Sequence, residues 1–365
     1  MNSNKKLPVL QEFEVLRCCA RVQFEPKHEA KVRQLLQQDI RWDHLIHLAL
    51  HHGVFPLLHK NLSKYFKDQV PPEVMARLKR QQFTLSAYVL FMAEELGRLV
   101  GLLDANNIPC LALKGLVLAQ VVYNNLILRS SGDVDLLIRP EDFADVEQLL
   151  AEDGYLPYEK VADLKGLRKK IYLWESRQFP FQRTDHVFSL DLHTGIMPPL
   201  YSLNLDFDTL MERSLPVTIS GNPIPSVGFE DMLQILCYHG VKNRWETLKY
   251  VCDLSELVRV RDNLDWDVIL KRAEATRGRR ILYLGLFLAH EVLEAPVPDA
   301  VMQHVREDHY IPSLGRHLID RLPHLVELGV TGFGERFRFH LLTQDTLVTK
   351  ARYALYALVR RSSIA

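Results

Sequence analysis

The sequence predicts an α+β protein that is mostly helical, with a small mixed β-sheet between two helical regions. Apolar residues recur at three- and four-residue spacing over about 10–100 and again from about 228 to the end. Such spacing is typical of amphipathic helices. Between these regions lie short apolar or alternating runs with the length of β-strands, over 108–113, 133–138 and 186–193.

Composition and length predict how the chain is divided. Apolar residues make up 47% of the 365 residues and charged residues 25%, as in a packed globular protein, and 45 Lys and Arg balance 45 Asp and Glu. Zero net charge excludes a generally basic nucleic-acid coat. At about 150 residues per domain we expect two or three domains. The changes of pattern place an N-terminal helical region at 1–98, an α/β core at 99–226 and a C-terminal helical domain at 227–365.

No sequence feature indicates secretion or membrane insertion. The five cysteines are scattered and form no CxxC pair, so neither a disulfide framework nor a zinc site is expected. The N-terminus has no continuous apolar run followed by a cleavage site. The longest apolar stretch, 281–293, contains His290 and Glu291 and is shorter than the roughly 18 residues of a membrane span. We expect a buried helix there and a cytoplasmic protein without stable membrane insertion.

Two aspartates on the second predicted strand are the strongest chemical signal. Asp133 and Asp135 are two residues apart, so on a strand they project from the same face, about 6.5 to 7 Å apart. Carboxylates at this separation can share one divalent ion or bridge two, and oxygen ligands suit Mg²⁺. Asp191, on the polar face of the 186–193 strand, is the expected third carboxylate, and that strand could pair beside the Asp133 strand. Asp185 has the same parity and is its rival.

The residues before these aspartates suit phosphate chemistry. Lys114-Gly115 ends the first predicted strand, and a helix-sized gap of about 13 residues follows. Gly115 leaves the backbone open to close approach, the next helix would aim its first N–H groups at a phosphate, and Lys114 adds a point charge. Arg129 either holds a triphosphate with its forked donors or pairs with Asp133 or Asp135.

Further candidates lie later in the chain. His193 shares a strand face with Asp191 and either assists a metal or acceptor or is structural. His239 and Lys242 are three residues apart and so share a helix face, from which Lys242 could close over a triphosphate. Trp245 and Asp253 are expected to be helix packing positions.

In this order the motifs resemble the DNA polymerase β-like nucleotidyltransferase superfamily, and an uncharacterised nucleotidyltransferase family in particular. That family has a strand ending in Lys-Gly, a helix, Arg-x-x-x-Asp-x-Asp-Leu-Leu, a strand with Asp-Leu-His, and a helix with His-Gly-x-Lys-x-x-Trp. The resemblance covers roughly residues 30 to 260. The matching residues here are Lys114-Gly115, Arg129, Asp133, Asp135, Asp191, His193, His239-Gly240, Lys242 and Trp245.

The resemblance implies a magnesium-dependent nucleotidyltransferase that moves a nucleoside monophosphate from an NTP to an acceptor and releases pyrophosphate. It implies two Mg²⁺ ions, with Mn²⁺ as a substitute, and a small mixed-sheet nucleotidyltransferase core. Lys114-Gly115 replaces the superfamily's usual Gly-Ser, as in toxin-type members with Lys-Gly-Gly. The implied catalytic and metal-binding residues are Asp133, Asp135 and Asp191, the implied nucleotide-binding residues are Lys114, Gly115, Arg129, Ser130, His239 and Lys242, and His193 is auxiliary.

Several alternatives stay open at the level of sequence. The acceptor is a small molecule, a sugar phosphate, a protein side chain or an RNA end, and neither the nucleobase nor the oligomeric state is indicated. The rival functions are a non-catalytic nucleotide-binding regulator and a toxin-like enzyme acting on tRNA. Residues 336–365 contain six Lys and Arg and one Asp, which indicates a basic C-terminal helix. We favour a helix docked by its Tyr and Leu face over one that contacts a membrane or nucleic acid.

Overall fold

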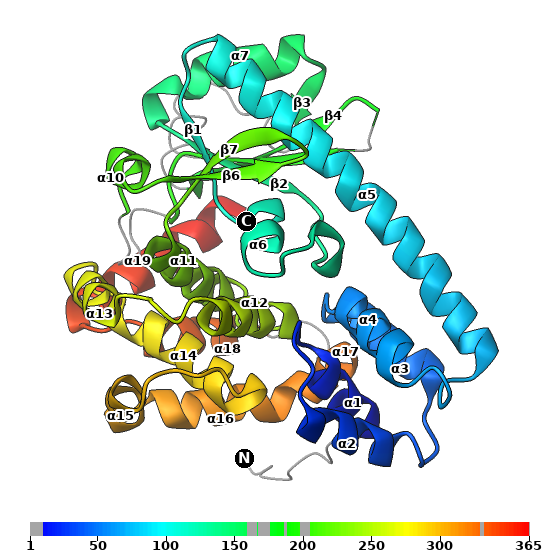
Figure 1. The fold of residues 1–365 in the computed structure, drawn as a ribbon. Helices are drawn as coiled ribbons and strands as arrows, with labels where there is room; N and C mark the ends of the chain where they lie inside the picture. The colour runs from blue at the N-terminus through cyan, green and yellow to red at the C-terminus, as the bar shows by residue number, and fades with distance from the viewer. Residues whose placement is uncertain are drawn as a thin grey trace.

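The computed structural model describes residues 10–158, 166, 176–185, 188–197, 205–328 and 332–364. One end of the long helix α5 lies beside a mixed sheet and its other end lies beside the helices α1 to α4, and the C-terminal helices form a second group (Figure 1). The first group comprises α1 (Gln11–Cys19), α2 (Pro26–Leu35), α3 (Trp42–His51), α4 (Phe55–Tyr65) and α5 (Pro72–Ala105).

Proline at the first or second position begins three of these N-terminal helices, α2, α4 and α5. Proline suits this position because the first N–H groups of a helix have no intrahelical partner. Helix α5 runs without a break through the predicted boundary between residues 98 and 99. The division into three domains stays a prediction.

Seven strands of the described residues form one sheet in the order β3-β4-β5-β2-β1-β7-β6. Two neighbouring pairs, β2 with β5 and β1 with β7, are parallel, and the others are antiparallel. The strands are β1 (Cys110–Ala112), β2 (Val134–Ile138), β3 (Tyr155–Pro157), β4 (Gln178–Arg183), β5 (Ser189–His193), β6 (Leu215–Ile219) and β7 (Asn222–Ser226). The predicted fold class, a mostly helical α+β protein with a mixed sheet, is confirmed. Residues 186 and 187 of the predicted third strand lie outside the described residues.

The connections within the core differ from the prediction at one point. The gap between the first two strands was expected to hold one helix, and it holds a six-residue helix and a separate 3₁₀ turn. The short elements of the core are α6 (Leu116–Val121), η1 (Leu126–Leu128), η2 (Pro140–Asp142), α7 (Phe143–Glu152) and α10 (Phe207–Glu212).

Strands β6 and β7 form a β-hairpin in a proline-containing part of the chain. Strands β6 and β7 pair antiparallel around a turn at Ser220 and Gly221, both of which have positive φ. Prolines are tolerated because β6 is the edge of the sheet and β7 pairs with β1 only near its end, at Ser226.

The C-terminal group is entirely helical over its described residues. Its members are α11 (Phe229–Lys242), α12 (Leu248–Val260), α13 (Trp266–Ala275), α14 (Arg279–Leu293), α15 (Asp299–Glu307), α16 (Ile311–Arg321), η3 (Leu322–His324), α17 (Leu325–Leu328), α18 (Phe333–Leu342) and α19 (Leu347–Ile364). Helix α14 is buried over most of its length, as predicted for 281–293. Glycine at 285 lets it approach α11, since a Cβ there would lie 2.5 Å from Sγ of Cys237. In the described part of the chain, no helix is long and apolar enough to cross a membrane.

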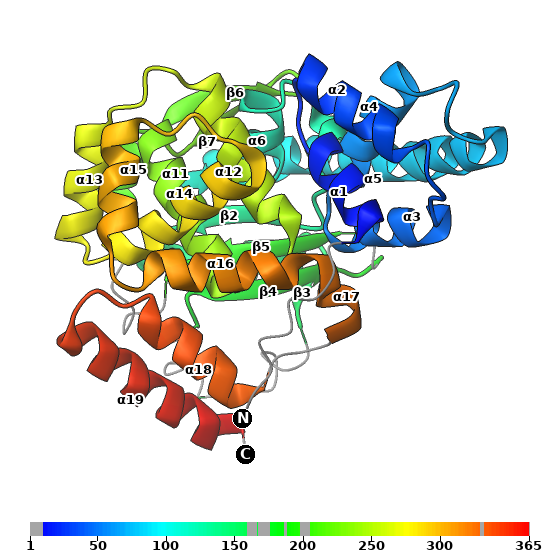
Figure 2. The same ribbon diagram turned by 90° about the horizontal axis from the view of Figure 1, so that it is seen from below.

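The last two helices form a hairpin beside the rest of this group (Figure 2). Tyr353 and Tyr356 of α19 are buried against Phe337 and Leu341 of α18. The basic C-terminal helix is thus docked by its tyrosine face, whereas Leu355 is exposed.

Candidate active site

Parallel pairing of β2 with β5 sets two aspartates side by side. Asp135 of β2 is in register with Asp191 of β5, and residues opposite one another in a sheet share a face. Asp133 lies one residue before β2, and its charge acts on Asp191. The pairing of these two strands, expected from the sequence, is confirmed. We call Asp133, Asp135 and Asp191 the carboxylate group; their catalytic roles stay a prediction.

Asp135 is the member of this group with direct cationic partners. Lys114 donates to Oδ2 of Asp135, and Nε2 of His193 lies 3.0 Å from Oδ1. Burial by itself raises the pKa of Asp135, but the charge of Lys114 and the hydrogen bond from His193 outweigh it and hold that pKa well below its usual range. Asp135 therefore carries its negative charge at neutral pH.

Asp191 has the opposite electrostatic environment. Burial, and then the charges of Asp133 and Asp135, raise its pKa to about 6. Nε2 of Gln178, on β4, donates to Oδ2 of Asp191, and Lys242 at the end of α11 donates to Oε1 of the same glutamine. No cation of the described residues pairs directly with Asp191, and Lys242 is connected to it through Gln178.

Gly115 forms the turn that leads from the first strand into α6. Its φ is +64°, a conformation that glycine adopts without strain. A Cβ at this position would make ordinary contacts, 3.7 Å from the Asp133 carbonyl oxygen and from Oγ of Ser131. Space is therefore not the reason for glycine at this position; the positive φ is. Ser130, half-buried, lies in the loop that enters β2.

Arg129 belongs to a different buried cluster. Its Nε and Nη2 donate to the two carboxylate oxygens of Asp253, each at 2.8 Å, and the Tyr123 hydroxyl donates to the same carboxylate at 2.6 Å. Its Nη1 donates to the Gly115 carbonyl and to Ser131. We call Arg129, Asp253 and Tyr123 the arginine cluster.

This arrangement corrects the expectation for Arg129. The interpretation in which it pairs with Asp133 or Asp135 is wrong, because both forked nitrogens are engaged by Asp253. The role of Arg129 in nucleotide binding stays a prediction. Asp253 is a packing position in the sense expected, since it is buried on α12 and ties that helix to the turn at Gly115.

The two candidates on α11 make different contacts. The His239 ring packs edge-on against Tyr250, with the ring centroids 5.2 Å apart. Burial, followed by the charge of Lys114, holds the pKa of His239 well below its usual value, so this imidazole is neutral. Lys242 reaches the sheet at Gln178. Their roles in nucleotide binding stay a prediction.

A divalent metal ion fits the donors at this site. Asp135, Asp191 and His193 each offer one ligand atom, and these atoms lie within 4.8 Å of one another. Among the described residues this is the one group of its kind. Carboxylate oxygens suit Mg²⁺ and Mn²⁺, and an imidazole nitrogen is also accepted by Mn²⁺ and other transition metals. The sequence predicts Asp133, Asp135 and Asp191 as the metal ligands, and that set stays a prediction; the structure adds His193 as a further donor.

The sequence model of an uncharacterised nucleotidyltransferase family matches residues 38–294. The match spans well over half of the chain and contains every residue of the carboxylate group. The chain belongs to this family. It is therefore a nucleotidyltransferase, an enzyme, and the resemblance stated from its motifs is confirmed. No curated protein matches the chain.

Two solved structures are similar to part of this nucleotidyltransferase. One is a solution structure of the antibiotic-resistance factor ANT(2'')-Ia, and the other is a crystal structure of ANT(2'')-Ia in complex with adenylyl-2''-tobramycin. Each is 14% identical in sequence, covers 52% of this chain and has a TM-score of 0.37. The matches cover 94% and 98% of those chains. The family assignment comes from the sequence model, since these TM-scores are low.

Sequence reasoning missed two polar residues beside the carboxylate group of this nucleotidyltransferase. Gln178 lies on β4, in a stretch without a motif, and becomes a neighbour of Asp191 only because β4 and β5 pair. Lys249, in the first turn of α12, reaches the site only because α12 packs beside α11. No local signal in the sequence marks either residue.

Proposed function

We propose that this nucleotidyltransferase uses Mg²⁺ to move the nucleoside monophosphate group of an NTP onto an acceptor oxygen. The acceptor oxygen forms a bond to the α-phosphorus, and the bond from that phosphorus to the β-phosphate oxygen breaks. Pyrophosphate leaves with the electron pair of the broken bond, and the acceptor proton passes to a base. The observation that carries the proposal is the register of Asp135 with Asp191, with Asp133 and Lys114 beside them.

Asp135 and Asp191 are the residues that would hold Mg²⁺, with Asp133 next to them and His193 as a further donor. Bound there, the metal supplies positive charge against the negative charge that develops on the phosphate oxygens. The charges of Asp133 and Asp135 add to the cost of ionising Asp191, because like charges repel in a partly buried site. Three carboxylates in this position favour a metal-dependent enzyme over the rival of a non-catalytic regulator.

Asp191 is the group that we assign to the acceptor proton. Its pKa of about 6 is close to neutral pH, where a general base is most effective. Asp135 is unsuited to the task, because Lys114 and His193 hold its pKa low. The two aspartates, both of which would hold the metal, therefore differ in one respect: Asp135 is kept ionised by its partners, and Asp191 is able to accept a proton.

Lys249 is the cation that we assign to the outer phosphates. Its stem packs across Gly53, where a Cβ would lie 3.1 Å from Cδ of the lysine. Its charge interacts with those of Lys114 and Asp133. Among the described residues, no oxygen accepts a hydrogen bond from its ammonium group, and burial, with the charge of Arg129, lowers its pKa. The ammonium group lies 6.0 Å from the centroid of the Tyr250 ring and has no anionic partner among the described residues, which is unfavourable for a half-buried cation. A bound triphosphate supplies the missing anion.

Lys114 has a different part in this proposal. Its ammonium group is engaged by Asp135, so its first task is to keep that carboxylate ionised. Lys242 holds Gln178, and through it the side chain of Asp191. Any acceptor with a free hydroxyl or phosphate oxygen meets the chemical needs of the reaction, so the proposal covers small molecules, sugar phosphates, protein side chains and RNA ends.

Calorimetric titration of the four NTPs into the purified protein, with and without Mg²⁺, tests the proposal without knowledge of the acceptor. We expect magnesium-dependent binding that is lost in Asp135→Asn and kept in Asp185→Asn, a matched control whose exposed carboxylate pairs with Arg183. Equal binding by wild type and Asp135→Asn would contradict the site.

The assignment of Lys249 has its own control. Lys249→Met is expected to weaken NTP much more than NMP, because only the NTP carries outer phosphates, whereas the exposed Lys271→Met changes neither. If Lys249→Met weakens NTP and NMP equally, Lys249 does not contact the outer phosphates.

A further inference from the structure

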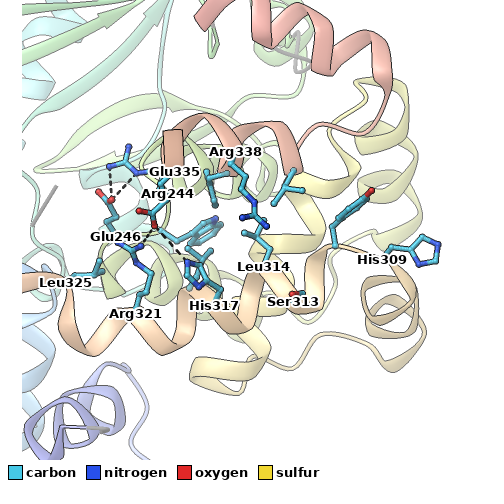
Figure 3. Close-up of a pocket in the computed structure, with 15 residues that line it drawn as sticks. Arg244, Glu246, His309, Ser313, Leu314, His317, Arg321, Leu325, Glu335 and Arg338 are labelled. Atoms are coloured by element: carbon cyan, nitrogen blue, oxygen red, sulfur yellow. Dashed lines mark hydrogen bonds and ion pairs between the residues drawn. The ribbon is translucent and has the colours of Figure 1, made fainter. Parts of the chain in front are cut away.

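A cavity of about 740 Å³ lies between α16 and α18, apart from the carboxylate group (Figure 3). Its third wall is the loop between α11 and α12, which contributes Arg244, Trp245 and Glu246. Ligand pockets typically have volumes of roughly 300–1,000 Å³. Helices α16 and α18 lie beyond residue 294, where the family match ends, so the family assignment says nothing of this cavity.

The apolar part of the lining is large and rigid. Trp245, Leu314, Leu318 and Phe339 all line the cavity and are buried. They come from the α11–α12 loop, α16 and α18, and so present aromatic and leucine side chains from three sides. An apolar lining with a few convergent polar groups is the usual composition of a small-molecule site.

The polar groups leave one cation without a partner. Nε and Nη2 of Arg244 donate to Oε1 of Glu246 at 2.9 and 2.7 Å, and Arg321 pairs with Glu335. Within the described part of the chain, Arg338 makes no hydrogen bond or ion pair. Its guanidinium points from α18 toward Leu314 of α16 (Figure 3). The three arginines of the lining face two glutamates, so one positive charge is left uncompensated.

The loop that forms the third wall is held in an unfavourable conformation. Arg244 and Trp245 are consecutive non-glycine residues with φ of +53° each, and such residues cost about 1–3 kcal/mol apiece. Glycine at 240 makes the conformation possible, because a Cβ there would lie 2.4 Å from the Trp245 ring. Nε1 of Trp245 is buried and has no hydrogen-bond acceptor among the described residues. Backbone strain and an unsatisfied donor at one wall are typical of functional sites.

We propose that this cavity binds a small organic anion with a flat apolar body, at a site distinct from the nucleotide site. Arg338 meets the anionic group, a phosphate, sulfonate or carboxylate, and the leucine and aromatic side chains enclose the body. A single negative charge on the ligand balances the single unpaired arginine. Arg244 lies two residues after Lys242, whose side chain donates to Gln178, the hydrogen-bond partner of Asp191.

Titration with 1-naphthalenesulfonate, followed by calorimetry and by the fluorescence of the probe, tests the proposal. We expect one saturable site per chain. 1-Naphthol, which lacks the anionic group, and methanesulfonate, which lacks the aromatic body, should each bind at least about tenfold more weakly. In Arg338→Ala the affinity for the sulfonate is expected to fall about tenfold or more. Arg338 is exposed and unpaired, so this variant should keep the stability of the wild type.

Matched controls separate the cavity from other places where the probe could bind. Arg316→Ala removes an exposed arginine of α16 that does not line the cavity, and it should bind as the wild type does. Leu318→Trp fills the cavity without changing charge and should abolish binding. Saturating Mg²⁺ and NTP should leave the probe bound. Equal affinities in Arg338→Ala and Arg316→Ala, or displacement of the probe by NTP, would overturn the proposal whether or not the protein is an active nucleotidyltransferase.

Discussion

Two buried charge clusters lie on either side of the turn at Lys114 and Gly115, and they differ in how their positive and negative charges balance. In the arginine cluster, both forked nitrogens of Arg129 meet the two oxygens of Asp253, and Tyr123 donates to the same carboxylate. In the carboxylate group, one cation, Lys114, faces three aspartates, and it pairs directly with only one of them.

The difference shows which cluster serves structure and which serves chemistry. A complete ion pair with every polar atom engaged needs no ligand, and it fixes α12 against the turn at Gly115. The excess of negative charge in the carboxylate group is unfavourable until a cation binds there. The raised pKa of Asp191 records this incomplete balance, whereas the low pKa of Asp135 records a completed pair.

The largest effect is expected from breaking the arginine cluster. Arg129→Met should lower the free energy of unfolding by about 3–5 kcal/mol, because Asp253 would remain buried without its cation. Urea unfolding followed by circular dichroism measures the loss. As a control, Arg139→Met removes the arginine of a more exposed pair with Asp208 and should cost about 0–1 kcal/mol. Similar losses in both variants would show that the arginine cluster is not the structural tie described above.

In the carboxylate group, the two paired aspartates should respond in opposite directions. In metal-free protein at pH 8, Asp135→Asn should lower the free energy of unfolding by about 1–3 kcal/mol, because Lys114 loses its buried partner. Asp191→Asn should raise it by roughly 1 kcal/mol, because a repelled carboxylate is removed. Thermal unfolding in the presence of a chelator gives both values. If Asp191→Asn also lowers the free energy of unfolding, the proposed difference between the two aspartates is wrong.

The pH dependence follows from the sign of the Asp191 shift. Its folded-state pKa of about 6 lies above the unfolded value of 3.8, so the contribution of this group to stability is present below about pH 4 and is lost as the pH rises through 6. Protons and Mg²⁺ compete for the ionised carboxylate. We therefore expect the rise in melting temperature caused by Mg²⁺ to grow between pH 5 and pH 7. Asp191→Asn should flatten that growth, and an unchanged profile in the variant would argue against Asp191 as the titrating ligand.

The smallest effect is expected at an exposed ion pair outside both clusters. Asp185 pairs with Arg183, and the Asp185 side chain is 44% exposed. Asp185→Asn should change the free energy of unfolding by less than about 0.5 kcal/mol. NTP binding measured by calorimetry should also be unchanged. A loss of magnesium-dependent binding in this variant would revive Asp185 as the third carboxylate.

The sequence by itself determined the features that depend on short spacing along the chain. Helical and strand periodicity gave the α+β fold class, and the two-residue spacing of Asp133 and Asp135 placed both on one side of a strand. The ordered motifs identified the family, because such motifs are stretches of contiguous residues. Local patterns did not predict the hairpin of β6 and β7, whose strands contain three prolines.

Only the tertiary structure decided which charges compensate one another. Arg129 meets a partner 124 residues away, and Lys242 reaches a glutamine 64 residues earlier in the chain. The sequence placed Arg129 close to Asp133 and Asp135, but α12 brings Asp253 into its fork, and Arg129 pairs with Asp253 instead. Electrostatic energy depends on the distance between charges in space and on their burial, and separation along the chain determines neither. Which charged residues form a complete ion pair, and which are left to bind a ligand, is therefore decided only when the helices pack against the sheet.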